Sequence, residues 1–124
     1  MAKKNKILIV EDEDVLRELL ITIMEENGLN VIGAADGIEA IELFKAHQDE
    51  IGIILSDLGL PRLGGWEAFL QMKLLNPELI GILASGYFDP DVKAQIIKSG
   101  AKYFIQKPYN PPEIIATLRQ LLDE

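Results

Sequence analysis

Short apolar runs alternate along this chain with longer segments in which apolar residues recur at helical spacing. Runs rich in β-branched residues predict buried strands, whereas apolar residues three and four positions apart predict helices with one buried face. The two kinds of segment follow each other in strict alternation. We therefore expect five strands and five helices, with the strands at residues 7–10, 30–34, a run ending at 57, 79–84 and 103–105.

Polar residues and prolines mark where several of these helices begin. Asp36 with Glu39 forms a capping-box pattern, Asn110 opens the last helix, and Asp89 precedes a proline. Stop signals at residues 27–28, 76–77 and 99–100 end three of the helices. The positions expected to face inward are Val15, Leu16, Leu19, Leu20, Ile23 and Met24, then Ile38, Ile41, Leu43 and Phe44, then Trp66, Phe69, Leu70, Met72 and Leu74, then Val92, Ile96 and Ile97, and finally Ile114, Ile115, Leu118, Leu121 and Leu122.

Strands and helices that alternate through short loops favour a parallel sheet with right-handed crossovers and helices on both faces. The expected fold class is therefore α/β, doubly wound, in three layers. No repeat, linker or low-complexity tract interrupts the pattern, so residues 1–124 are expected to form one domain. A chain of this length can bury a core without disulfides.

Composition narrows the possible functions. A net charge of −8 disfavours direct nucleic-acid binding, which needs clustered basic residues. The chain has no cysteine, and its one histidine, His47, falls at the polar end of a predicted helix, where we expect an exposed residue. The basic start is followed by too few apolar residues for a signal peptide, and no segment is long enough for a membrane span. A cytoplasmic protein is expected.

Chemically useful side chains follow four of the five predicted strands. Glu11 and Asp12 follow the first strand, Asp57 the third, Ser85 the fourth and Lys107 the fifth. Each can be explained alone as a turn or capping residue. The carboxyl ends of parallel strands share one edge of the sheet, however, which is where open α/β sheets bind ligands. We therefore expect these residues to form one site.

Three crowded carboxylates repel one another and call for a cation. Oxygen ligands without His or Cys suit a hard divalent ion, with Mg²⁺ the natural choice. A carboxylate can also attack phosphorus to give an acyl phosphate, which Lys107 and Ser85 would help by contacting phosphoryl oxygens. The hypothesis from the residues alone is a metal-dependent phosphoryl acceptor at Asp57.

The chain resembles the receiver domain of two-component response regulators over essentially its whole length. The similar segments are residues 7–12 (ILIVED), 57–61 (DLGLP), 85–86 (SG) and 100–108 (GAKYFIQKP). Their order and spacing together are specific, although no single segment is. The resemblance implies a flavodoxin-like fold with strand order 2-1-3-4-5, the order for which a receiver protein serves as an example.

The resemblance also implies roles for the residues at the strand ends. Asp57 would be phosphorylated by a sensor histidine kinase or a histidine phosphotransfer domain, and Ser85 and Lys107 would contact the phosphoryl group. Mg²⁺ would be bound by Asp12, by Asp57 and by the backbone carbonyl of Gly59, with Glu11 acting through water. Family members usually have a cis peptide between the lysine and the following proline. The chain would assist its own phosphorylation without being an enzyme for another substrate.

In this family the fourth helix, fifth strand and fifth helix form the output surface, which contacts a downstream effector. Ser85 and Phe104 occupy the switch positions. Glu11, Ser85 and Phe104 stand where Asp, Thr and Tyr are commoner, and Phe104 has no hydroxyl to hydrogen bond. Gly59 offers no side chain near the acyl phosphate, which Tyr87 could shield instead. The expected output-surface residues are Tyr87, Phe88, Tyr103 and Tyr109.

Alternatives stay open on the sequence alone. Asp12-Glu13-Asp14 resembles the signature of a haloacid-dehalogenase-like Mg²⁺ phosphatase, with Asp12 as nucleophile, although nothing acidic lies between Asp91 and Glu113. A receiver-like module that binds without phosphorylation is a third class. A flavodoxin is disfavoured because the acidic residues 11–14 of this chain would repel the phosphate that the first loop of a flavodoxin binds. The sequence also has no Gly-x-x-x-x-Gly-Lys motif for a nucleoside triphosphate. The chain could be a stand-alone regulator or part of a hybrid kinase or longer regulator, and a monomer or a phosphorylation-dependent dimer.

Overall fold

The computed structural model describes residues 4–60, 62–101 and 103–123. Within these ranges five strands alternate with five helices, as the apolar pattern predicts. The strands are β1 (Lys6–Val10), β2 (Asn30–Ala34), β3 (Ile51–Asp57), β4 (Ile80–Ser85) and β5 (Tyr103–Gln106). The helices are α1 (Asp14–Glu26), α2 (Gly37–Ala46), α3 (Gly65–Leu75), α4 (Pro90–Lys98) and α5 (Pro111–Asp123).

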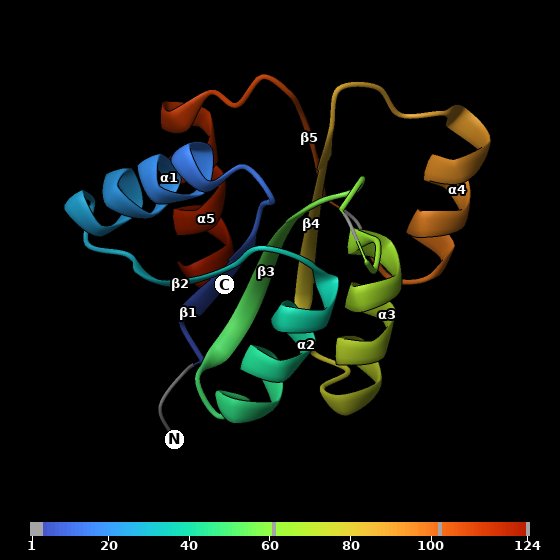
Figure 1. Ribbon diagram of the computed structural model, residues 1–124, viewed down its shortest axis with the longest axis horizontal. Coiled ribbons are helices and arrows are strands. Elements are labelled where there is room, and N and C mark those ends of the chain that lie inside the picture. Colours follow the sequence, from blue (N-terminus) through green and yellow to red (C-terminus); the bar gives the residue numbers. More distant parts are fainter. Residues whose placement is uncertain (1–3, 61, 102, 124) are drawn as a thin grey trace.

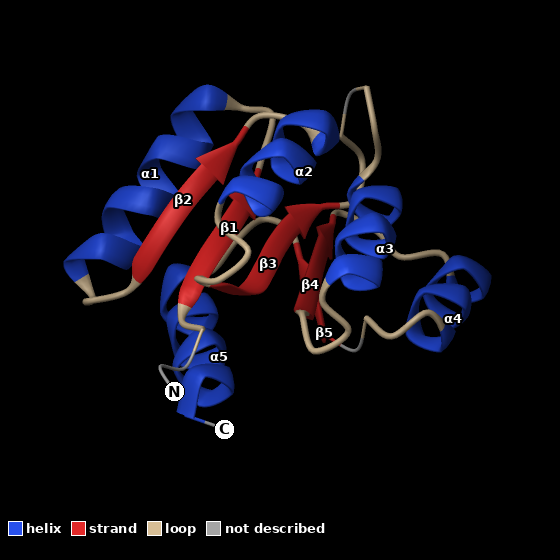
Figure 2. Cartoon of the chain, turned by 90° about the horizontal axis from the view of Figure 1, so that it is seen from below, coloured by secondary structure: helices blue, strands red, loops and turns tan. Residues whose placement is uncertain are grey.

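All the strand pairs are parallel, and the strand order in the sheet is β2-β1-β3-β4-β5. Helices α1 and α5 lie side by side on one face of the sheet, and α2, α3 and α4 cover the other (Figures 1 and 2). This three-layer arrangement confirms the flavodoxin-like fold class. It also brings the carboxyl ends of all five strands to one edge.

The core is divided between the two faces of the sheet. Successive strand residues point to opposite faces, so Leu8 and Val10 pack with α2 and α3 whereas Ile7 and Ile9 pack with α1 and α5. Because helices cover both faces, almost every position of a central strand is buried. This explains why the strands read as continuous apolar runs rather than as alternating ones.

The predicted helix starts are confirmed by side-chain caps. The Glu39 N–H donates to Asp36 Oδ1 over 2.9 Å, and the Asp91 N–H donates to Asp89 Oδ1 over 2.9 Å. At the start of α5 the Glu113 N–H donates to Asn110 Oδ1 over 3.2 Å. No helix in the described ranges has the length and apolar character needed to cross a membrane.

The predicted inward faces of several helices are too wide. In α1, Leu20 and Met24 are buried, but Val15 and Leu19 are 81% and 52% exposed. In α4 only Ile96 is buried, whereas Val92 and Ile97 are exposed, and Leu74 at the end of α3 is 84% exposed. Helical spacing identifies the side that faces the sheet, but tertiary packing decides how much of it is covered. Pro61, the last residue of the DLGLP segment, lies outside the described residues.

Replacing Phe44 tests whether this side chain belongs to the buried core. Phe44 is fully buried, so Phe44→Ala should lower the free energy of unfolding by about 3–5 kcal/mol through lost burial and a residual cavity. The exposed Leu74 provides the matched control, and Leu74→Ala should change the free energy of unfolding by no more than about 0.5 kcal/mol. Urea unfolding followed by circular dichroism measures both. Equal effects of the two substitutions would contradict this core.

Candidate functional site

Three carboxylates meet at the carboxyl edge of the sheet. Glu11 and Asp12 follow β1 and Asp57 ends β3, and these strands are neighbours with Val10 opposite Ser56. One oxygen from each of the three carboxylates lies within 4.8 Å of the others. Glu11 is buried, Asp57 is half-buried and Asp12 is exposed. The convergence expected from the strand ends is therefore present for all three acids.

Lys107 follows β5, at the edge of the sheet, and reaches these carboxylates from there. Its Nζ lies 3.1 Å from Glu11 Oε1 and 3.2 Å from Asp57 Oδ2. The Lys107 N–H donates to the Ser85 carbonyl over 2.9 Å, which fixes the lysine backbone beside β4. The peptide bond between Lys107 and Pro108 is cis, as the family resemblance implies. One ammonium thus bridges acids from two strands.

Burial and hydrogen bonding set the charges in this pocket. Burial raises the pKa of Glu11, and hydrogen bonds from the Glu13 N–H and from Lys107 offset this only in part. Burial alone would lower the pKa of Lys107, but its hydrogen bonds to Glu11 and Asp57 outweigh that effect and raise the pKa. Lys107 therefore stays charged at neutral pH, as the counter-ion of a pocket that is otherwise acidic.

The donor set of the pocket fits a hard divalent cation. Every side-chain ligand in the cluster of Glu11, Asp12 and Asp57 is a carboxylate oxygen, the donor type that Mg²⁺ prefers. With three carboxylates and one ammonium, the pocket keeps a surplus of negative charge when these groups are ionised. This cluster could therefore hold a metal ion.

Asp57 also begins a turn, so its membership of the acidic cluster and its turn role are compatible. The Gly59 N–H lies 3.3 Å from Asp57 Oδ1, and the Leu58 N–H donates to the Ala84 carbonyl over 2.8 Å. The first residue of α3, Gly65, packs directly on the end of β3, where an added Cβ would lie 2.1 Å from the Asp57 carbonyl oxygen. The turn therefore leaves the strand along a closely packed path.

Ser85 lies at the same edge, but its hydroxyl is bonded to its own loop. Ser85 Oγ donates to the Tyr87 carbonyl over 2.8 Å and accepts from the Tyr87 N–H over 3.3 Å. Its hydrogen bonds in the described structure thus go to Tyr87, not to the carboxylates. A contact between Ser85 and a group on Asp57 would require the Ser85–Tyr87 hydrogen bond to open.

The aromatic residues expected at the output surface do not form one cluster. Phe88 packs edge-on against Phe104 with ring centroids 5.2 Å apart, and Lys93 Nζ lies 4.8 Å from the centre of the Phe104 ring. Tyr103 packs on the opposite face of the sheet, because neighbouring residues of a strand alternate. Lys107 Nζ lies 5.3 Å from the centre of the Tyr109 ring. The side chain of Tyr87 is 73% exposed. Tyr103 and Tyr109 thus pack with the core on the α1 and α5 face of the sheet, and their place in the output surface stays a prediction.

Arg17 is a residue of this site that the sequence did not reveal. Its Nη1 donates to the Glu11 carbonyl over 2.8 Å, and its Nη2 lies 2.7 Å from Asp14 Oδ1. The three-residue spacing from Asp14 to Arg17 predicts their ion pair on a helix, but not the contact with Glu11. Arg17 thus engages Asp14, which is not a member of the acidic cluster among the described residues.

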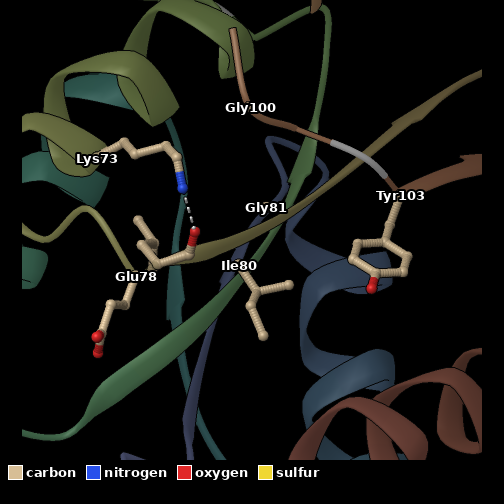
Figure 3. Close-up of a pocket in the computed structure, with 7 residues that line it drawn as sticks. Lys73, Glu78, Ile80, Gly81, Gly100 and Tyr103 are labelled. Carbon is tan, nitrogen blue, oxygen red and sulfur yellow. Dashed lines mark hydrogen bonds between the residues drawn. The ribbon is translucent and has the colours of Figure 1, made fainter. Parts of the chain in front are cut away.

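A separate cavity of about 340 Å³ lies near the amino ends of β4 and β5, away from the carboxylates. Figure 3 shows Lys73 reaching across its wall to a backbone carbonyl, and Lys73 Nζ donates to the carbonyls of Pro77 and Leu79 over 2.8 and 3.0 Å. The lysine therefore ties the α3–β4 connection together. Among the described residues that line this cavity, only Lys73 and Glu78 carry a charge.

Comparison with known proteins agrees with this architecture. Residues 7–119 match the response regulator receiver domain, and the chain therefore belongs to that family. It is 30% identical to the chemotaxis protein CheY of Thermotoga maritima, with 94% of this chain and 96% of that protein covered. It is 29% identical to the sensor kinase CckA of Brucella abortus, where the match covers 95% of this chain and 12% of the kinase.

Solved structures show the same relationship. A complex of CheX and CheY with BeF₃ and Mg²⁺ from Borrelia burgdorferi contains a similar chain, with a TM-score of 0.86 and 26% identity over 94% of this chain and 88% of that one. Some curated relatives are much longer than this chain. It spans 12% of the kinase and about half the length of the transcriptional regulators that it matches.

Removing Lys107 separates its electrostatic role from metal binding. Without Mg²⁺, Lys107→Met should lower the free energy of unfolding by about 1–3 kcal/mol, because the buried Glu11 carboxylate loses its cation. Millimolar Mg²⁺ should raise the melting temperature of the wild type, because it binds the folded pocket and not the unfolded chain. The rise should be larger for Lys107→Met, because the pocket without the ammonium is more negative.

Lys6→Met is the control, because Lys6 pairs with Glu50 at the surface over 3.5 Å, a contact that contributes about 0–1 kcal/mol. Thermal unfolding with and without Mg²⁺ measures all three proteins. Melting temperatures that Mg²⁺ leaves unchanged in both the wild type and Lys107→Met would rule out a metal site at this pocket.

Proposed function

We propose that residues 1–124 are a phosphoacceptor domain of a two-component phosphorelay, in which Asp57 takes a phosphoryl group from a phosphohistidine. The observation that carries this proposal is the Lys107 ammonium 3.2 Å from Asp57 Oδ2, in a pocket with two further carboxylates. Phosphoryl transfer needs charge neutralisation and in-line positioning more than acid–base chemistry. A lysine, a carboxylate nucleophile and oxygen ligands for a metal are the groups that such a step needs.

In the proposed step, an Asp57 carboxylate oxygen attacks phosphorus as the bond from phosphorus to the histidine nitrogen breaks. Lys107 then exchanges part of its contact with Asp57 for a phosphoryl oxygen, while Glu11 keeps the other side of the ammonium in place. Mg²⁺ would be held by Asp12, Asp57 and the Gly59 carbonyl, with Glu11 acting through water. When bound, the ion neutralises charge on the phosphoryl oxygens. The Mg²⁺ in the related CheX–CheY complex supports Mg²⁺ as the choice of ion.

Ser85 and Phe104 would carry the change outward to the surface formed by α4, β5 and α5. To donate to a phosphoryl oxygen, Ser85 Oγ must give up its hydrogen bond to the Tyr87 carbonyl. This loosens the loop that leads to Phe88, whose ring packs against Phe104. Phe104 has no hydroxyl, so its position depends on packing with Phe88 and on the Lys93 ammonium above the ring. A downstream effector, or a second receiver in a phosphorylation-dependent dimer, would read this change.

The phosphatase alternative is less well supported than the receiver. It needs Asp12 and Asp14 to act together, whereas Arg17 holds the Asp14 carboxylate over 2.7 Å. In the receiver, by contrast, Asp57 would be the phosphoryl acceptor, and Lys107 is its partner. The chain would promote the gain and hydrolysis of its own phosphoryl group and would not turn over a separate substrate.

A sensor histidine kinase or a histidine phosphotransfer domain is the proposed partner, and similarity to a sensor kinase supports this. An apolar groove of about 310 Å³ lies beside Lys107, between α1 and the start of α5. The exposed side chains of Val15 and Leu19 extend the apolar surface at α1. Such a surface beside the acceptor suits a protein donor. Kinases of this class use ATP, so we place the domain in the cytoplasm.

Phosphorylation of Asp57 can be tested without a partner. Incubation with acetyl phosphate and Mg²⁺ should add one phosphoryl group, seen by intact-protein mass spectrometry, and base should remove it. Asp57→Asn should abolish the adduct, whereas Asp14→Asn should retain it because Asp14 lies outside the cluster. An adduct that persists in Asp57→Asn and disappears in Asp12→Asn would favour the phosphatase. No adduct on the wild type would favour a binding module.

The docking surface at α1 can be tested with a protein donor. Val15→Glu should slow transfer from a phosphorylated histidine phosphotransfer domain by about tenfold, because a charge replaces an exposed apolar contact. The rate with acetyl phosphate should not change. Leu74→Glu is the matched control, since Leu74 is equally exposed at the opposite end of the fold. A similar loss with both donors, or the same loss in the control, would contradict docking at α1.

A further inference from the structure

The loop from β3 to α3 carries Gly59, whose carbonyl is a proposed metal ligand. At its first end the loop is held by the hydrogen bond from Leu58 to Ala84 and by one from the Gly65 N–H to the Leu58 carbonyl, over 3.2 Å. Gly59 itself is exposed, and no atom lies within 4 Å of the place where its Cβ would be. Apart from its N–H, which lies 3.3 Å from Asp57 Oδ1, the position of Gly59 therefore depends on what holds the rest of the loop.

An ion pair holds the second part of this loop. Both Nε and Nη2 of Arg62 donate to Asp36 Oδ2, over 2.9 and 2.7 Å. Arg62 has a φ of +64°, a left-handed conformation that residues other than glycine rarely adopt. Such a conformation persists when the surroundings enforce it. Asp36 is positioned to do so from a segment 26 residues earlier in the chain.

Asp36 is itself a fixed anchor. Its Oδ1 accepts from the Glu39 N–H over 2.9 Å and so caps α2, while Oδ2 binds Arg62. The residue is only 8% exposed. The Glu39 N–H and then Arg62 lower the pKa of the Asp36 carboxyl, which is therefore ionised at neutral pH. The two carboxylate oxygens thus join the start of α2 to the loop.

A backbone contact supports the same attachment independently. A Cβ added at Gly37, the first residue of α2, would lie 2.3 Å from the Leu63 carbonyl oxygen. The loop backbone one residue beyond Arg62 therefore rests directly on the first turn of α2. The ion pair and this close approach locate the loop against the same helix end.

We propose that Arg62 and Asp36 are positioning residues for the acceptor site, because their ion pair holds the loop whose Gly59 carbonyl would bind Mg²⁺. This inference rests on the proposed function, since it concerns the metal site of the same reaction. Neither residue touches the reacting atoms. Their loss should weaken metal binding and leave the chemistry at Asp57 intact once Mg²⁺ is bound.

Two substitutions break the ion pair from opposite sides. Arg62→Gln removes the cation, and Asp36→Asn removes the anion while keeping a side chain that caps helices equally well. Titration calorimetry with MgCl₂ should show each variant binding Mg²⁺ about three- to tenfold more weakly. This is less than the roughly 10–100-fold cost of losing a group bonded directly to a metal ligand, because the ion pair acts on Gly59 only through the loop. The double variant should be no weaker than either single one, because both remove the same contact.

Kinetics with acetyl phosphate separate positioning from general damage. The Mg²⁺ concentration for half-maximal phosphorylation should rise by the same factor as the dissociation constant, while the rate at saturating Mg²⁺ stays within about twofold. Arg119→Gln is the matched control, since Arg119 is also exposed and anchors another loop by donating to the Asn27 carbonyl over 2.9 Å. It should leave Mg²⁺ binding unchanged.

Variants that melt at a lower temperature but bind Mg²⁺ as tightly as the wild type would overturn the inference, because the ion pair would then be structural only. A lower rate at saturating Mg²⁺ would also overturn it. Failure of the proposed function looks different. In that case the wild type itself would show neither Mg²⁺ binding nor phosphorylation.

Discussion

The site depends on one interaction, the Lys107 ammonium held between the carboxylates of Glu11 and Asp57. A buried carboxylate is costly unless it is paired, and Glu11 is completely buried. The ammonium of Lys107 offsets this cost and also places a positive charge next to the acid that we propose as nucleophile. Because the same ammonium contacts both acids, any new group on Asp57 changes the electrostatic environment of Glu11 as well.

The topology makes this contact possible. Asp57 ends a central strand, Glu11 follows its neighbour, and Lys107 follows β5, two strands away on the other side. Parallel pairing sends all three to the same edge, although 96 residues separate Glu11 from Lys107. The β3–α3 loop completes that edge and is attached to α2 by Arg62. The pocket is thus assembled from several connections, each fixed by a separate contact.

Apolar periodicity in the sequence predicted the elements, and parallel topology predicted the meeting of Glu11, Asp12, Asp57 and Lys107. The strand order followed from the family resemblance. The sequence could not predict how much of a helix face is covered, so Val15 and Leu19 were expected inside and lie in solvent. It assigned Phe104 to the switch and Tyr103 to the output surface, and strand alternation places these two rings on opposite faces of the sheet. The contacts of Arg17 with Glu11 and of Arg62 with Asp36 depend on side-chain geometry and carry no periodic signal.

The most direct test is to identify the carboxylate that carries the phosphoryl group. Borohydride reduces an acyl phosphate to an alcohol, so the acceptor aspartate becomes homoserine and can be located by peptide mass spectrometry. After incubation with acetyl phosphate and Mg²⁺, we expect homoserine at position 57 alone, and none when Mg²⁺ is omitted. Reduction at Asp12 in place of Asp57 would contradict the account of this site.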